Sequence, residues 1–142
     1  MLDELRGWAG AEPTCRPSHR PLSVEETLAL ADGELVEIGA HTVTHPALGP
    51  LPPSSQREEI VQSKARLEDL LGRPVMSFAY PHGDYTAETV SIVREVGFAR
   101  ACSFTFAGLV HPSTDPFRLP RVQIQDWDGE ELARRLSAWF DG

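Results

Sequence analysis

Helix-start patterns that alternate with short apolar segments are the feature that most constrains the fold of this chain. Ser23 and Ser55 each stand three residues before a glutamate, which is the capping-box pattern, and Asp128 precedes Glu131 in the same way. Thr86 is a further capping residue, because the valines that follow it recur on one helix face. The sequence therefore predicts four helices after residue 22, over residues 23–31, 55–71, 86–96 and 128–140.

Apolar segments of strand length lie between the predicted helices. They are residues 35–38, 75–80, 98–104 and 117–124, the last interrupted by Pro120. Helices and strands that alternate indicate βαβ units and a mainly parallel sheet. The predicted fold class is therefore α/β, and the loops that follow its parallel strands should emerge at one end of the sheet.

The composition is that of a single globular domain. The chain has 142 residues, of which 41% are hydrophobic and 24% charged, so it can bury a sizeable core. A net charge of −8 argues against a nucleic-acid surface, and no apolar run approaches membrane-spanning length. The acidic start of the chain lacks the apolar core of a signal peptide, so we expect a cytoplasmic protein with Cys15 and Cys102 as free thiols.

Residues 1–21 are expected to lie outside the main domain. Residues 2–9 fit a short helix, and residues 10–21 carry Pro13, Pro17 and Pro21, which indicates a linker. The predicted domain organisation is therefore an N-terminal helix with a Pro-rich linker over residues 1–21, and one domain over residues 22–142.

The segment from His41 to Pro46 carries the clearest chemical signal. Two imidazoles four positions apart are a usual way to hold one divalent metal ion. A helix is disfavoured there, because Pro46 pushes His45 toward extended geometry and Val43 with its threonine neighbours favours extended backbone. We therefore predict a loop beyond the strand at residues 35–38. The alternative is that both histidines are solvated loop residues, and the His-x-x-x-His spacing by itself does not distinguish this from a metal site.

A second loop, Pro-His-Gly-Asp at residues 81–84, follows the strand predicted at residues 75–80. With both loops in view, the chain resembles the NodB-homology polysaccharide deacetylases, a carbohydrate esterase family, from about Leu22 to Trp139. The segment His41–Pro46 looks like the family's metal motif, His-Ser/Thr-x-x-His. Residues 77–85 are similar to its aromatic-Pro-x-Gly segment, and residues 117–122 to an end-strand pattern of one branch. The resemblance implies a partial (β/α) barrel.

The resemblance also implies a chemistry and a set of site residues. Family members hydrolyse N- or O-acetyl groups on sugar polymers, with a metal, usually zinc, held by two histidines and one aspartate, and with a second aspartate as general base. On this chain the metal ligands would be His41 and His45. The residues of the substrate groove would be Tyr80, Pro81, His82 and Arg121. A core role for Tyr80 and a surface ion pair for Arg121 stay open as alternatives.

The chain departs from the family pattern at the catalytic aspartates. The family's Thr-Phe-Asp-Asp-Gly motif is missing, and no two aspartates are adjacent anywhere in the sequence. We therefore expect the C-terminal portion of the domain. The conceivable substitutes Asp84, Asp115 and Asp126 stand in turn-forming contexts. A zinc hydrolase site uses three protein ligands, so two imidazoles should bind zinc, or another divalent metal, weakly.

The expected function is that of a metal-dependent deacetylase of acetylated carbohydrate, inactive as an isolated chain because the base and the third ligand are missing. The alternative is a non-catalytic remnant that binds a carbohydrate or a partner protein through the same groove. Helix 55–71 is expected to be an amphipathic scaffold whose charges form a solvated face. Missing leading strands would leave the sheet edge near residues 35–38 unpaired, so we also expect self-association through that edge.

Overall fold

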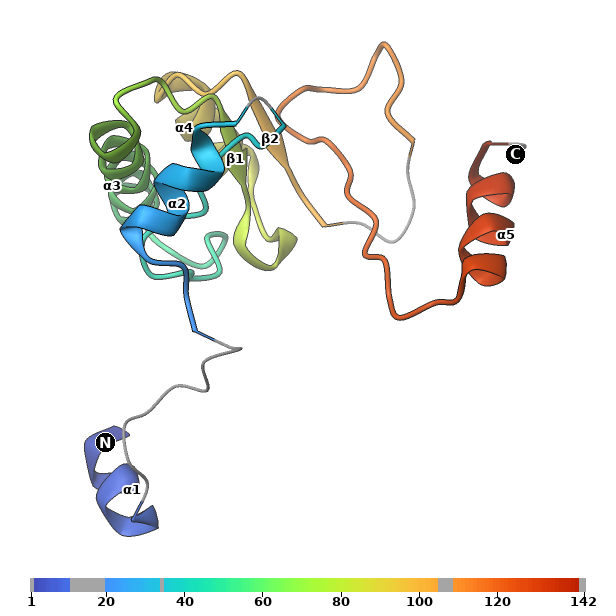
Figure 1. The fold of residues 1–142 in the computed structure, drawn as a ribbon. Helices are drawn as coiled ribbons and strands as arrows, with labels where there is room; N and C mark the ends of the chain where they lie inside the picture. The colour runs from blue at the N-terminus through green and yellow to red at the C-terminus, as the bar shows by residue number, and fades with distance from the viewer. Residues whose placement is uncertain (1, 11–19, 34, 105–108, 141–142) are drawn as a thin grey trace.

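Three helices around a small parallel sheet form the central body of the protein (Figure 1). The computed structural model describes residues 2–10, 20–33, 35–104 and 109–140. The helices of the body are α2 (Val24–Ala31), α3 (Pro53–Leu71) and α4 (Ala87–Glu95), and the strands are β1 (Ser77–Ala79) and β2 (Arg100–Cys102). Helix α1 (Leu2–Ala9) and helix α5 (Gly129–Phe140) lie apart from the body at the two ends of the chain (Figure 1).

The sheet is parallel, as predicted. Strand β1 pairs with β2 so that Phe78 lies opposite Ala101. Single parallel bridges extend the sheet on both sides, from Ala40 to Phe78 and from Cys102 to Leu119. Four segments of the chain thus lie side by side in the order Ala40, β1, β2 and Leu119, and all run in the same direction.

The strand predicted at residues 35–38 does not form, and the nearest bridge lies two residues beyond it, at Ala40; the strand predicted at residues 117–124 is reduced to the bridge at Leu119. Ala40 donates its N–H to the Ser77 carbonyl and accepts the Ala79 N–H, both at 2.9 Å. Upstream of it the chain lies beyond the end of the three-residue β1 and has no ladder to join, and Leu35 is 99% exposed. Apolar composition alone does not make a strand without a neighbouring strand to supply hydrogen bonds.

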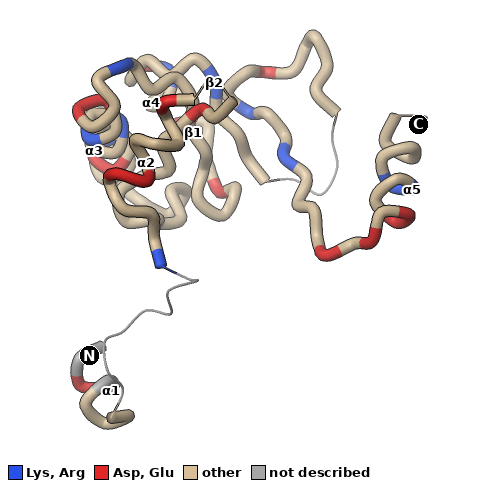
Figure 2. Tube along the Cα trace, viewed as in Figure 1, with Lys and Arg blue, Asp and Glu red and all other residues tan. Residues whose placement is uncertain are grey.

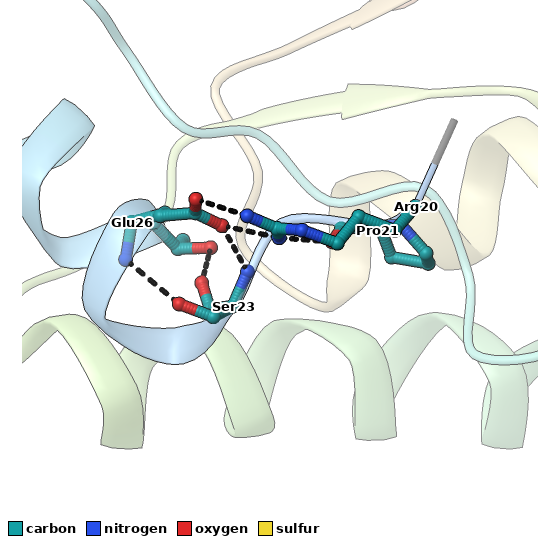
Figure 3. Close-up of polar contacts among 5 residues, drawn as sticks. Arg20, Pro21, Ser23 and Glu26 are labelled. Atoms are coloured by element: carbon teal, nitrogen blue, oxygen red, sulfur yellow. Dashed lines mark hydrogen bonds and ion pairs between the residues drawn. The ribbon is translucent and has the colours of Figure 1, made fainter. Parts of the chain in front are cut away.

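Helix α2 begins at the capping box that the sequence predicts. The Glu26 N–H donates to Ser23 Oγ at 3.2 Å, and the Ser23 N–H donates to Glu26 Oε2 at 2.7 Å. Arg20 donates two hydrogen bonds, of 2.5 and 2.7 Å, to the same Glu26 carboxylate (Figure 3). These contacts satisfy backbone groups that the first helical turn leaves without partners.

The other helix boundaries follow local rules, with one correction. Helix α3 starts at Pro53, two residues before the predicted cap Ser55, because proline is well suited to the first helical position. It ends at Gly72, whose φ of 63° makes the left-handed C-terminal turn. Thr86 caps α4 through a capping box with Thr89, as predicted. Asp128 Oδ1 accepts the Glu131 N–H at 2.8 Å before α5.

The hydrophobic core lies between the sheet and helices α3 and α4. Its aromatic centre is Phe78, which packs against Tyr80 with ring centroids 5.4 Å apart and against Phe98 at 5.2 Å. A buried hydrogen bond of 2.7 Å from Thr89 to Gln56 joins the two helices. The buried cluster consists of Ala40, Leu48, Ile60, Val75, Phe78, Tyr80, Val90, Ile92, Val93, Phe98, Ala101 and Phe117.

The ends of the chain contribute little to this core. Helix α1 forms where predicted, with Trp8 89% exposed, and α5 has no buried residue. Charged residues of both signs are spread along the chain in the body and in α5 (Figure 2). Most of the predicted linker, together with Cys15, lies outside the described residues, whereas Cys102 is free. Every described helix is too short or too polar to span a bilayer.

Candidate metal centre

Two loops meet at one end of the sheet because each follows a parallel segment. Residues 41–46 follow Ala40, and the 3₁₀ turn Pro81–Gly83 follows β1, which is bridged to Ala40 through Phe78. Neighbouring parallel segments release their loops side by side, as in other sheets that carry ligands at this end. The topology thus places His82 next to His45, although the two residues are far apart in sequence.

The orientation of His41 is fixed by a backbone contact. Its Nδ1 lies 2.8 Å from the Ala79 carbonyl oxygen, which can only accept a hydrogen bond, so Nδ1 carries the proton. The lone pair of the neutral ring is then on Nε2, the other nitrogen. Histidines that bind metal ions are held by such a partner, because it sets both the tautomer and the ring direction.

The three imidazoles form a chain of edge contacts. The ring centroids of His41 and His45 lie 4.7 Å apart, and those of His45 and His82 lie 4.5 Å apart. All three side chains are exposed. The structure thus brings the two predicted metal ligands together, and it adds His82, which the sequence analysis assigned to the groove, as a direct neighbour of His45.

The backbone of the histidine loop differs from the extended geometry expected at His45. Thr42 has a φ of 65° and His45 a φ of 61°, both on the left-handed side of the Ramachandran map. Thr42 Oγ1 accepts the His45 N–H at 3.1 Å, which turns the chain back within three residues. This local hydrogen bond outweighs the extended preference imposed by Pro46. The segment is a loop and not a helix, as predicted.

The donors fit a divalent metal only in part. Imidazole nitrogen suits zinc and its neighbours in the transition series, and His41 presents a free Nε2. Among the described residues, however, no group of three or more His, Cys, Asp or Glu side chains is arranged to hold a metal ion. The pair His41 and His45 would therefore supply only two of the three or more ligands that such a site needs.

The aspartates named as possible third ligands have other partners or lie elsewhere. Asp84 Oδ2 accepts the Gly49 N–H at 2.7 Å, and a Cβ on Gly49 would lie only 2.8 Å from that oxygen. Asp84 thus ties the second loop to the chain beyond His45. Asp115 pairs with Arg94 at 2.5 Å and accepts the Phe117 N–H at 3.0 Å, whereas Asp126 is exposed.

The residues predicted for the substrate groove occupy two environments. Tyr80 and Pro81 are buried, and the Tyr80 hydroxyl donates to the Phe117 carbonyl at 2.9 Å. Burial raises the pKa of Tyr80 far above its ordinary value, so the hydroxyl stays protonated. Arg121 is exposed, and its Nε donates to the Ser103 carbonyl at 3.3 Å rather than to an acid. The burial of Tyr80 matches the alternative in which this residue packs in the core.

Glu59, on α3, is the residue that the sequence analysis missed. Its side chain accepts hydrogen bonds from Val43 and Thr44 in the histidine loop, whereas the charges of this helix were expected to face solvent. A cavity of about 380 Å³ lies beside these contacts, lined by the loop and by α3. The capping and periodicity signals of α3 give no sign that Glu59 contacts loop residues 15 and 16 positions earlier in the chain.

Comparisons with known proteins agree with this fold. The family model "Polysaccharide deacetylase" matches residues 17–101. The chain shares 24% identity and a TM-score of 0.74 with the Streptococcus pyogenes deacetylase PplD in complex with acetate, covering 83% of this chain and 52% of that one. With a polysaccharide deacetylase from Bacillus cereus the chain shares 21% identity and a TM-score of 0.72, and the match covers 94% of this chain and 46% of that one. None of the curated proteins matches the chain in sequence.

A pseudoenzyme has a related fold. The CE4 family pseudoenzyme BA3943 from Bacillus anthracis shares 23% identity and a TM-score of 0.51, covering 55% of this chain and 27% of that one. The chain thus spans about half the length of the deacetylases it matches, or less. These likenesses show the fold, a part of the deacetylase (β/α) barrel. The family match extends over more than half of the sequence, and the chain therefore belongs to the polysaccharide deacetylase family.

Proposed function

We propose that this chain carries the histidine half of a divalent metal site for the deacetylation of acetylated carbohydrate. The observation that supports it most directly is the hydrogen bond of His41 Nδ1 to the Ala79 carbonyl, which leaves the lone pair on Nε2 of a ring whose centroid lies 4.7 Å from that of His45. A bound divalent metal supplies Lewis-acid polarisation of an acetyl carbonyl at such a site. Zinc is favoured by the imidazole donors, and its binding is weak because two ligands are too few.

The residues of this chain do the positioning part of that chemistry. The Ala79 carbonyl keeps the His41 proton on Nδ1, and Thr42 Oγ1 holds the His45 backbone in the turn. Asp84 accepts a hydrogen bond from the Gly49 N–H and so fixes the position of the loop that carries His82. The chain has no adjacent pair of aspartates to supply a general base and a third ligand. The proposed activity therefore requires carboxylates from outside this chain, and the chain alone does not turn over substrate.

A second candidate is a non-catalytic domain that binds acetylated carbohydrate or a partner protein. The missing aspartate pair favours it, and the likeness to a pseudoenzyme of this fold supports it. The two candidates agree that the isolated chain is inactive. They differ in whether added carboxylates restore turnover.

The proposal is tested by zinc titration in a calorimeter. We expect the wild type to bind zinc weakly, the double variant His41→Ala, His45→Ala to lose this binding, and the control His111→Ala, in a different exposed loop, to retain it. Equal binding by the wild type and the double variant would refute the metal site.

Acetate release from acetylated chito-oligosaccharide, xylan and peptidoglycan fragments separates the two candidate functions. The chain alone should release none. Adding a family N-terminal segment with the Asp-Asp motif should restore zinc-dependent release, because general-base catalysis typically supplies roughly 10²–10⁴-fold in rate. Failure of the added segment would favour the non-catalytic candidate. Turnover by the chain alone, abolished in His41→Ala, would contradict the need for outside carboxylates.

A further inference from the structure

Glu59 binds the histidine loop with both of its carboxylate oxygens. Oε2 accepts the N–H groups of Val43 at 2.7 Å and Thr44 at 2.9 Å, and Oε1 accepts the Thr44 hydroxyl at 2.6 Å. These three contacts join the loop to helix α3, which is anchored in the core through Ile60, the next residue. Two of the three residues between His41 and His45 are thus held by a single side chain.

The backbone of this loop needs such a partner. Thr42 and His45, at either end of the bound pair, have positive φ angles of 65° and 61°. Non-glycine residues in this region cost on the order of 1–3 kcal/mol each, and the cost is higher for a β-branched residue such as Thr42. Successive backbone N–H groups beside a left-handed residue form a concave nest that binds an anion. Glu59 supplies that anion from within the chain.

The carboxylate is charged in this setting. Burial by itself would raise the pKa of Glu59, but the hydrogen bonds from Thr44 and Val43 outweigh it and leave the pKa below its ordinary value. Arg57 and Lys64, the nearby cations on α3, form ion pairs with Glu95 and Glu68. Within the described part of the chain, the contacts of Glu59 go to the loop instead. Its hydrogen bonds are therefore directed to the loop rather than to a surface cation.

From this geometry we propose that Glu59 is a positioning residue that holds His41 and His45 at the spacing needed for one metal ion. The role rests on the proposed metal function, and it acts through the loop backbone and not through contact with the metal. Partners that orient metal ligands typically change metal affinity by roughly 10–100-fold when they are removed. Loss of the three hydrogen bonds should let Thr42 and His45 relax toward negative φ and move the two imidazoles apart.

The test compares zinc affinity among variants of α3. We expect Glu59→Ala to bind zinc roughly 10–100-fold more weakly than the wild type. Glu59→Gln, which keeps an acceptor oxygen but not the charge, should fall between them. The matched control is Glu58→Ala, because Glu58 is exposed and accepts a hydrogen bond from Gln62 on the same helix. Unchanged affinity in Glu59→Ala, or an equal loss in Glu58→Ala, would overturn the proposal.

A second variant and a second readout guard against misfolding and against failure of the metal site itself. Thr44→Val removes one of the three hydrogen bonds without changing the shape of the side chain, and it should weaken zinc binding by a smaller factor. Amide hydrogen exchange at Val43 and Thr44 reports the loop without metal. If the wild type binds no zinc, the proposed function fails, and exchange decides the role of Glu59: faster exchange in Glu59→Ala supports it and unchanged exchange overturns it.

Discussion

At the scale of single residues, unfavourable backbone conformations gather at the two loops. Among the described residues, the non-glycine positions with positive φ are Thr42, His45 and His82, at 65°, 61° and 58°. Each costs on the order of 1–3 kcal/mol, and strain of this kind persists where surrounding contacts hold it in place. Glu59 and Thr42 Oγ1 provide those contacts in the first loop. The strain therefore lies in the two loops that carry the residues of the proposed site.

Gly83 offers a stability test of the second loop. Its φ is 70°, and a Cβ there would lie 2.8 Å from the Phe104 backbone nitrogen, so Gly83→Ala should lose more than about 1 kcal/mol of unfolding free energy. Gly72 is the matched control, because it has a similar φ of 63° but no atom within 4 Å of the added Cβ. Urea unfolding measures both. Equal losses for the two variants would show that the contact with Phe104 does not matter.

At the scale of elements, the start of α2 depends on one charged cluster (Figure 3). The Arg20 guanidinium and, after it, the Ser23 N–H lower the pKa of Glu26 from an ordinary 4.5 to about 2. A carboxyl with a lowered pKa in the folded state stabilises that state above its ordinary pKa, and the stabilisation is lost as the pH falls toward the folded value. The cluster is exposed, so salt should screen it.

We therefore predict that α2 loosens as the pH falls from about 4.5 toward about 2. The protection of the amides along residues 24–31, measured relative to the intrinsic exchange rate at each pH, should fall over this range in the wild type, and the change should be absent in Glu26→Gln. Arg20→Gln should bring the midpoint of the Glu26 carboxyl titration, followed by NMR, back toward its ordinary value. A midpoint that does not move in Arg20→Gln would contradict the assigned cause.

At the scale of the whole molecule, the sheet has an edge that the described residues leave open. The segment at Ala40 pairs with β1 on one side, and no described segment pairs with it on the other. Leu35 and Val36, just upstream, are 99% and 40% exposed. Open edges beside exposed apolar side chains favour association between chains, because unpaired N–H and C=O groups can join a second strand.

We propose that the protein self-associates through this edge. Sedimentation velocity should show a mass that rises with protein concentration, and Leu35→Lys should shift the equilibrium toward monomer, since a lysine on an edge disfavours pairing. Val110→Lys is the control, because Val110 is 61% exposed in a different loop. A sharply monomeric wild type that melts cooperatively would rule out this association.

The sequence by itself determined the local structure of this protein. The caps at Ser23, Thr86 and Asp128 and the stop at Gly72 lie where the sequence predicts them, because each depends on hydrogen bonds within four residues of the chain. The two loop motifs and their place after parallel segments also followed from the sequence. Ser55 was the exception, since Pro53 two residues earlier is the better helix start.

Only the tertiary structure decided the rest, because those features depend on groups far apart in the chain. The strand predicted at residues 35–38 does not form, and the nearest bridge lies at Ala40, since pairing there depends on the length of β1. His82 lies against His45 because parallel segments bring their loops together. Glu59 holds the histidine loop through hydrogen bonds to residues 15 and 16 positions away, which no local propensity encodes.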